Sequence, residues 1–283
     1  MTDAIAVVTG AARGLGKGIA RALAAEGMTV FVTGRSAESL AEVTGEIAAA
    51  GGTARPVVCD HSDDAAVAAA FAAIGQEAGR IDLLVNNAAA VYPDQLAGSA
   101  PFWEKDVKLA EMIDVGLRSS YVATWHAARL LLAAPAALVA HISFYGAVSY
   151  FHGPAYGAAK AGTDKMAFDM GHDFAATPVS CVSFWPGFIL TDAFRAVPEE
   201  YLPEAIRETL PKWESPEFSG RVLHRLWRDP AGKELNGSTV IGAELGRRYG
   251  ITDTGGAVPP DFRDQFGSPD GDRFGVPASE FPL

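Results

Sequence analysis

Short apolar runs alternate along the chain with longer segments in which apolar positions recur every three or four residues. The apolar runs end at glycine or polar residues and are typical of buried strands; they cover residues 4–9, 29–33, 57–59, 81–85, 138–142 and 179–184. The segments between them have helical spacing; they cover residues 15–26, 37–50, 62–76, 103–132 and 155–174. Because strands and helices alternate and the strands are almost wholly apolar, the pattern predicts a parallel sheet with helices on both faces.

The pattern contains no internal repeat and no linker long enough to separate two domains. We therefore expect one α/β domain over residues 1–250, a Rossmann-type doubly wound parallel sheet of about seven strands. Residues 251–283 are rich in proline, glycine and aspartate, which indicates an irregular C-terminal tail. Residues 192–213 contain several prolines, and their position predicts a lid over a substrate site.

Composition narrows the possible partners. The 283 residues carry a formal net charge of -11, which argues against nucleic acid because phosphate binding needs a basic surface. We expect no signal peptide, and the apolar stretch 130–140 is too short to span a membrane. The two cysteines lie in apolar runs and the histidines lack ligand spacing, so we expect a cytoplasmic protein without a disulfide or a metal site.

A glycine-rich turn joins the first predicted strand to the first helix. Gly10, Gly14 and Gly16 let the backbone approach a phosphate, and the start of the helix offers unpaired N–H groups. Arg13 and Leu15 lie between these glycines. In a doubly wound sheet this position binds a dinucleotide, although a glycine cluster can also serve only as a tight turn.

The end of the second strand indicates which dinucleotide binds. A carboxylate here would hold the ribose hydroxyls of NAD, but the chain has Gly34 followed by Arg35. Arg35 and Arg13 together suit the 2′-phosphate of NADP(H). We therefore expect NADP(H) to be preferred, with NAD(H) possible; in the alternative, both arginines are solvated surface groups.

Tyr156 and Lys160 lie four positions apart, which is about one turn of a helix. An ammonium group at that place favours the phenolate, so we expect Lys160 to lower the pKa of Tyr156. Such a tyrosine can exchange a proton with a carbonyl oxygen, and the Ser143 hydroxyl could hold the same oxygen. An exposed Tyr and Lys on a helix surface would show the same spacing, so the motif is weak by itself.

Taken together, the motifs resemble those of the short-chain dehydrogenase/reductase family. The chain carries them in the family's order over residues 4–192: the glycine turn, Asp60, Asn86-Asn87-Ala88-Ala89, Ser143-x-x-Gly146, Tyr156-x-x-x-Lys160 and Pro186-Gly187-x-x-x-Thr191. Each motif is weak, but the ordered set is specific. The resemblance implies an NAD(P)-dependent enzyme in which Ser143, Tyr156 and Lys160 are catalytic.

The resemblance also assigns residues to the cofactor. Asp60 would bond the adenine amino group, and Lys160 would bond the nicotinamide ribose in addition to acting on Tyr156. The residues that would form the cofactor wall and line the nicotinamide are Asn87, Ala88, Pro186, Gly187, Ile189 and Thr191. In the structural alternative, Asp60 is an acid at a helix N-terminus and the asparagines form a turn.

One position departs from the family pattern. Many relatives carry an asparagine in the middle of the long helix before the fifth strand, where it holds a water that links the lysine to solvent. This chain has Gly116 at that position, in Asp114-Val115-Gly116-Leu117. The route of the proton relay is therefore in doubt, unless the bare backbone carbonyl of Gly116 or a second water replaces the side chain.

These observations predict an NADP(H)-dependent reductase that converts an apolar ketone or aldehyde into an alcohol, with Tyr156 as the acid. Aromatic candidates for the pocket wall are Tyr92, Phe102, Trp103, Tyr145, Tyr150, Phe151, Phe188, Phe194 and Tyr201. The alternatives are an NAD-dependent alcohol dehydrogenase and a dinucleotide-binding sensor without turnover. As in the family, the helices at 103–132 and 155–174 are expected to pair between subunits of a homodimer or homotetramer.

Overall fold

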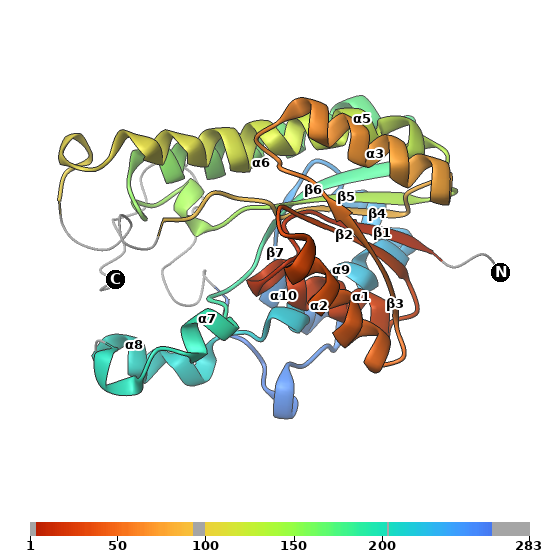
Figure 1. Ribbon diagram of the computed structural model, residues 1–283. Coiled ribbons are helices and arrows are strands. Elements are labelled where there is room, and N and C mark those ends of the chain that lie inside the picture. The colour runs from red at the N-terminus through yellow and green to blue at the C-terminus, as the bar shows by residue number, and fades with distance from the viewer. Residues whose placement is uncertain (1–3, 93–99, 203, 262–283) are drawn as a thin grey trace.

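The computed structural model describes residues 4–92, 100–202 and 204–261, and it contains a seven-stranded parallel sheet (Figure 1). The strands are β1 (Ile5–Val8), β2 (Thr29–Gly34), β3 (Thr53–Val58), β4 (Leu83–Asn86), β5 (Ala137–Ile142), β6 (Val179–Trp185) and β7 (Thr239–Ile241). Their order across the sheet is β3-β2-β1-β4-β5-β6-β7. The predicted doubly wound fold is confirmed.

Helices cover both faces of the sheet, as Figure 1 shows. One face carries α1 (Gly14–Ala25), α2 (Ala37–Ala49), α9 (Pro216–Arg228) and α10 (Gly242–Tyr249), and the other carries α3 (Asp64–Ala78), α5 (Ser119–Leu132) and α6 (Pro154–Phe174). Successive strand residues face opposite sides, so Val8 and Val32 pack into the first core while Val7 and Phe31 pack into the second. This explains why the central strands are apolar at nearly every position, whereas the edge strand β3 is largely exposed.

Helices α1 and α9 approach each other so closely that their contact requires glycine. A Cβ on Gly18 would lie 2.1 Å from Cβ of Pro216, and a Cβ on Gly220 would lie 2.6 Å from Cβ of Ala22. Since α1 begins at the glycine turn and α9 begins just after the predicted lid, this contact ties the two regions together.

The predicted helix over residues 103–132 is wrong in its first half. Regular α5 is preceded by 3-10 turns at Phe102–Glu104 and Val107–Ala110 and by a π-helical turn at Ile113–Arg118. Within the π-helical turn Val115 leaves the helical conformation (φ -105°, ψ 57°), and its carbonyl accepts a hydrogen bond from the Ala90 N–H at 2.7 Å. This bond draws the backbone away from a regular helix, toward the loop after β4.

The predicted lid consists of short helical pieces, α7 (Asp192–Arg195), α8 (Glu204–Thr209) and intervening 3-10 turns. In Figure 1, α7 and α8 stand apart from the sheet. Of the predicted tail, the structure describes residues 251–261, which contain a 3-10 turn at Thr254–Gly256; residues 262–283 lie outside the described part. No helix in the described ranges is both long and apolar enough to cross a membrane.

Candidate active site

The glycine turn after β1 is shaped to sit directly on the chain that follows β4. Gly10 (φ 63°) and Gly14 (φ 57°) adopt left-handed conformations that favour glycine. A Cβ on Gly10 would lie 2.8 Å from Cα of Ala88, and one on Gly16 would lie 2.5 Å from Nδ2 of Asn87. Side chains at Gly10 and Gly16 would therefore separate the turn from the loop after β4.

Thr9 and Asn87 fasten these two segments together. The Thr9 hydroxyl accepts hydrogen bonds from the backbone N–H groups of Asn87 (2.9 Å) and Ala88 (3.0 Å). Nδ2 of Asn87 donates in return to the carbonyls of Thr9 (2.9 Å) and Gly10 (3.1 Å). No role was predicted for Thr9. In the sequence it is marked only as a hydroxyl residue at the end of an apolar run.

The start of α1 fits a dinucleotide phosphate. Arg13 is the N-cap residue, and its side chain, which has no acceptor atom, makes no capping hydrogen bond. The first N–H groups of α1 therefore have no side-chain cap, as in helices that bind phosphate. Leu15 is half-buried and packs into the first core, which anchors this end of the helix. Thr191, in the segment after β6, lies close to this turn, because a Cβ on Gly14 would lie 3.7 Å from its Cγ2.

The groups expected around the adenosine lie at the ends of β2 and β3. Arg35 and Arg13 are both exposed. Asp60 accepts hydrogen bonds from the Ser62 N–H (2.9 Å) and hydroxyl (2.7 Å), which lower the pKa of its carboxyl, and the charge of Arg35 contributes. The N-cap of α3 is Asp63, not Asp60. Asp60 is thus an ionised group at a strand end, where it can accept a hydrogen bond from a ligand.

Tyr156 and Lys160 lie together near the start of α6. The Lys160 Nζ is 5.5 Å from the centroid of the Tyr156 ring and donates a hydrogen bond to the Ile142 carbonyl at 3.0 Å. Both side chains are half-buried rather than exposed. The arrangement differs from that of a Tyr and a Lys on a solvated helix face.

The expected lowering of the Tyr156 pKa is not found. Burial raises the pKa of the phenol above its ordinary value. Burial also lowers the pKa of the Lys160 ammonium to about 8, and the Asp164 carboxylate limits that fall. The attraction of the lysine was expected to lower the pKa of Tyr156. The loss of water around the buried phenol raises this pKa and is the larger effect.

Ser143 follows β5 and is buried, but its hydroxyl is not directed as expected. Its Oγ donates a hydrogen bond to the Lys160 backbone carbonyl at 3.1 Å. This hydroxyl must give up that hydrogen bond before it can donate to a substrate oxygen, and side-chain rotations of this kind are fast. The structure therefore brings Ser143 to the expected strand end in a rotamer that contacts α6.

Aromatic rings surround Tyr156 and account for its burial. Ring centroids of His152, Phe151 and Phe144 lie 5.1, 6.2 and 6.4 Å from that of Tyr156, and a Cβ on Gly146 would lie 2.7 Å from its Cε1. His152 has a left-handed backbone (φ 59°), which is unusual for a residue other than glycine. Such a conformation costs free energy and is found more often at functional sites than elsewhere.

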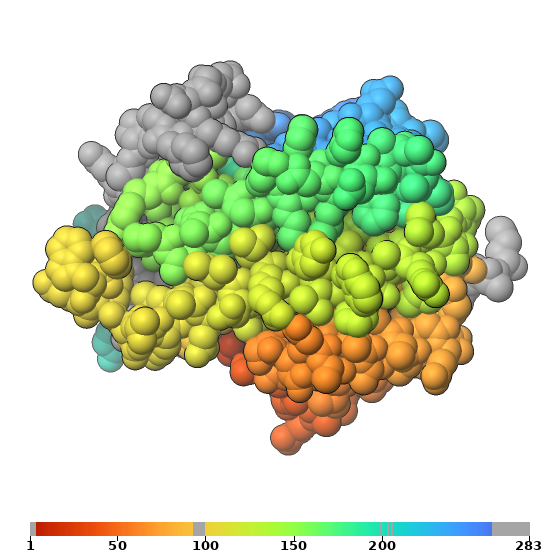
Figure 2. Space-filling view, turned by 90° about the horizontal axis from the view of Figure 1, so that it is seen from above, coloured from red at the N-terminus to blue at the C-terminus, as the bar shows by residue number. Residues whose placement is uncertain are grey.

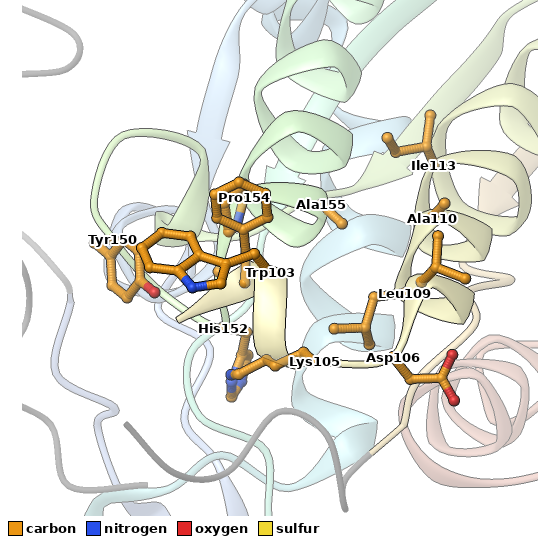
Figure 3. Close-up of a pocket in the computed structure, with 13 residues that line it drawn as sticks. Trp103, Lys105, Asp106, Leu109, Ala110, Ile113, Tyr150, His152, Pro154 and Ala155 are labelled. Atoms are coloured by element: carbon orange, nitrogen blue, oxygen red, sulfur yellow. The ribbon is translucent and has the colours of Figure 1, made fainter. Parts of the chain in front are cut away.

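A cavity of about 380 Å³ opens next to His152, between the start of α6 and the turns before α5. Figure 3 shows Trp103 and Tyr150 on one side and Leu109, Ala110 and Ile113 on the other. Of the aromatic wall candidates, Phe102, Trp103 and Tyr150 line this cavity, while Phe151 and Phe188 pack with Phe144 near Tyr156. Tyr145 is buried against Trp185 instead and belongs to the core.

The segment after β6 lies where a nicotinamide wall was expected. Pro186 is buried at its start, and the Thr191 hydroxyl near its end accepts a hydrogen bond from the Phe194 N–H (3.4 Å) as the cap of α7. Ile189 forms a parallel bridge with Glu214, and Gly187 contacts the Glu214 carboxyl. Sequence reasoning missed Glu214, because an isolated acid after a lid has no distinguishing pattern.

Gly116 lies in the π-helical turn before α5. Its carbonyl oxygen accepts a hydrogen bond from the Ser120 hydroxyl at 2.7 Å, and a Cβ at this position would meet no atom within 4 Å. This carbonyl was expected to be bare, but it already accepts a hydrogen bond from Ser120. Any water that reaches it shares it with Ser120.

Comparison with known proteins gives a consistent result. The family model of the short chain dehydrogenases matches residues 4–202. Over 271 residues the chain is 36% identical to dehydrogenase/reductase SDR family member 1 of Homo sapiens, covering 93% of this chain and 87% of that protein. The resemblance to this protein was also visible at Phe102-Trp103, Val115 to Arg118, Ser183 to Gly187 and Arg247 to Gly250.

More distant matches agree. The chain is 31% identical over 253 residues to cis-4-hydroxycyclohexanecarboxylate dehydrogenase of Sinomonas cyclohexanicum, covering 88% of this chain and 97% of that protein. A crystal structure of a dehydrogenase/reductase from Sinorhizobium meliloti 1021 superposes with a TM-score of 0.73 at 28% identity, covering 85% of this chain and 94% of that chain.

Proposed function

Because the chain belongs to the short-chain dehydrogenase/reductase family and is an NAD(P)-dependent oxidoreductase, we propose that it uses NADP(H) to reduce a ketone or aldehyde, with Tyr156 as the acid. The observation that carries this proposal is the half-buried pair of Tyr156 and Lys160, with Lys160 bonded to the end of β5 and Tyr156 packed in one cluster with Phe188 of the segment after β6. The residues on the phosphate side fit a dinucleotide, because α1 begins right after the glycine turn and no side chain caps its first N–H groups.

The chemistry divides between cofactor and protein. A bound nicotinamide supplies hydride to the carbonyl carbon. The raised pKa of Tyr156 keeps its phenol protonated at neutral pH, so it carries the proton that the developing alkoxide needs. Lys160, with a pKa of about 8, is mainly charged at neutral pH and stabilises the phenolate left behind. A rotated Ser143 hydroxyl would hold the substrate oxygen in place.

The cavity beside His152 supports an apolar substrate. Its wall combines exposed rings of Phe102, Trp103 and Tyr150 with aliphatic side chains. Rings of this kind favour a bulky or ring-bearing carbonyl compound. A relative that is named for a hydroxycyclohexanecarboxylate is consistent with a cyclic substrate. The short helices at 192–213 would close over it as the lid.

The test of the proposed activity is a screen of ketones and aldehydes of increasing apolar size. Reduction of each compound is measured as the loss of NADPH absorbance. We expect cyclic and aromatic ketones to be reduced faster than small polar ones. If NADPH binds but no carbonyl compound is consumed, the sensor alternative holds. If oxidation of alcohols with NAD is the faster reaction, the alternative of an NAD-dependent alcohol dehydrogenase holds.

The preference for NADP(H) rests on Arg35, which lies exposed at the end of β2 near Asp60. Replacing Arg35 by Ala should weaken NADPH binding by roughly 10- to 100-fold, because the variant loses the charged hydrogen bonds to the 2′-phosphate. NADH has no such phosphate, so its binding should be nearly unchanged. Nicotinamide fluorescence titration measures both affinities. Arg55→Ala is the control, because that exposed arginine pairs with Glu77 at 3.1 Å. Equal losses for both cofactors would contradict the assignment.

Oligomer formation is proposed from the outer face of α5 and α6, which Figure 2 views directly. Tyr121 and Trp125 of α5 and Phe168 of α6 are each more than half exposed, at 54%, 65% and 59%. Large exposed rings of this kind mark contact surfaces. A homodimer or homotetramer through this face would cover them, and light scattering after size-exclusion chromatography distinguishes these states from a monomer.

A further inference from the structure

Glu214 is an acid in an unusual place. It lies between the lid and α9, and only 1% of its surface is exposed. Neither carboxyl oxygen has a geometrically well-formed hydrogen bond among the described residues. A buried ionised carboxyl without strong partners is costly, so such a residue calls for an explanation.

Both the backbone and the side chain of Glu214 hold the segment after β6. Its N–H donates to the Phe188 carbonyl at 2.7 Å, and its carbonyl accepts from the Leu190 N–H at 2.9 Å. Its carboxyl lies against the backbone of Gly187, since a Cβ there would be 2.6 Å from Oε1 and 2.9 Å from Cδ. Any change in the carboxyl group is therefore felt directly at Gly187.

The surrounding charges do not compensate Glu214. Asp253, which follows α10, accepts hydrogen bonds from Ser215 and pairs with Arg221 of α9 at 3.1 Å. Arg221 is thus engaged by Asp253 rather than by Glu214, and the segment from Pro186 to Thr191 contains no titratable side chain. Burial, and then the charge of Asp253, raise the pKa of Glu214 to about 8, although the Gly187 N–H favours the charged form. Glu214 is protonated at neutral pH.

We propose that Glu214 is a positioning residue that keeps the Gly187–Leu190 segment in place for the dinucleotide only while its carboxyl carries a proton. The inference rests on the proposed function, because it takes this segment as the nicotinamide wall. When the carboxyl ionises, the new charge is buried and needs water, and water can reach it only if the segment packed on it shifts. Cofactor affinity therefore falls in alkaline solution.

The same proton affects the stability of the ligand-free protein. The folded pKa of about 8 lies above the ordinary glutamate pKa of 4.5, so the folded chain holds a proton that the unfolded chain releases. The contribution of this proton to stability is full below the unfolded pKa, decreases as pH rises, and is lost above the folded pKa. Glu214→Gln keeps the shape of the neutral carboxyl and removes this pH dependence.

The experiment measures the Kd for NADPH by nicotinamide fluorescence between neutral and alkaline pH. If binding requires the protonated form of Glu214, its ionisation should weaken NADPH binding to the wild type about tenfold between pH 7 and pH 9. In Glu214→Gln this tenfold contribution should vanish, and only the pH dependence from other groups should remain. Lys160 also titrates near pH 8, but it does so in both proteins, so their difference isolates Glu214. Glu217→Gln on α9, which loses the ion pair with Arg21, is the matched control and should behave as the wild type.

A direct measurement covers the case in which Glu214→Gln does not fold. With glutamate labelled by carbon-13 at the side-chain carboxyl, the wild type should show one carboxyl resonance whose titration midpoint lies above pH 7. This midpoint should move to higher pH when NADPH is added. The absence of any such resonance would overturn the proposal, as would identical pH profiles of wild type and Glu214→Gln. A failure of NADPH to bind at any pH would instead overturn the cofactor assignment.

Discussion

Replacing Tyr156 by Phe lowers the rate of carbonyl reduction by roughly 10²- to 10⁴-fold, the usual contribution of a positioned acid. The phenol is half-buried among Phe144, Phe151 and His152, so water has little access to replace its proton. The ring itself remains in the variant, and with it the packing on Gly146. Steady-state kinetics with the best substrate of the carbonyl screen measures the loss.

Affinity for NADPH separates this effect from damage to the fold. The Phe variant should bind the cofactor within about twofold of the wild type, because glycine turn and Arg35 are untouched. Tyr121→Phe is the matched control, since it removes a phenol from an exposed position on α5 and should leave turnover unchanged. Full activity of Tyr156→Phe would refute the assigned acid.

Replacing Gly18 by Ala should destabilise the protein by about 3 kcal/mol, because overpacking of this kind forces backbone shifts. The new Cβ would lie 2.1 Å from Cβ of Pro216 and 2.6 Å from its backbone carbonyl carbon. Neither atom belongs to a flexible side chain, so α1 and α9 must move apart. Urea denaturation of the ligand-free protein measures the change.

Gly45→Ala is the matched control for this prediction. Gly45 is exposed within α2, and a Cβ there would meet nothing within 4 Å. Alanine is the better helix former, so this variant should gain about 0.5–1 kcal/mol. The two substitutions make the same chemical change in two helices and should have opposite signs. Equal stability of Gly18→Ala and the wild type would mean that α1 and α9 are not in close contact.

The strands and most helices could be predicted because their signals are local. Both faces of the sheet are covered, so residues such as Val30, Phe31 and Val32 are all buried and leave an apolar run in the sequence. The seventh strand was expected but could not be located. β7 has only three residues, Thr239–Ile241, and its place is set by pairing with Ser183 to Trp185 of β6, which no local pattern reveals.

The start of the helix before β5 was mispredicted for a similar reason. Residues 103–118 have helical spacing, but the side chain of Asp106 accepts a hydrogen bond from the Lys108 N–H (2.9 Å) and Lys105 is extended. The bond between Ala90 and Val115 crosses to another segment. Local propensity cannot anticipate such competing partners.

The proximity of Tyr156 and Lys160 could be predicted from the sequence, but the energetics of the candidate site could not. The four-residue spacing of Tyr156 and Lys160 fixes their neighbourhood on α6 whatever surrounds them. The pKa of Tyr156, the rotamer of Ser143 and the burial of Glu214 depend on packing against distant segments. Each of these was missed or wrongly signed, because burial is a property of the whole fold.

The Ile189–Glu214 bridge makes the stretch between these residues a loop that leaves and re-enters the fold at one point. The free-energy cost of closing such a loop grows only slowly with its length. A replacement of different size and sequence can therefore be spliced in at the bridge without disturbing β6 or α9. Grafting residues 192–213 from another family member, with Ile189, Thr191 and Glu214 retained, would therefore test whether this stretch sets the proposed substrate preference.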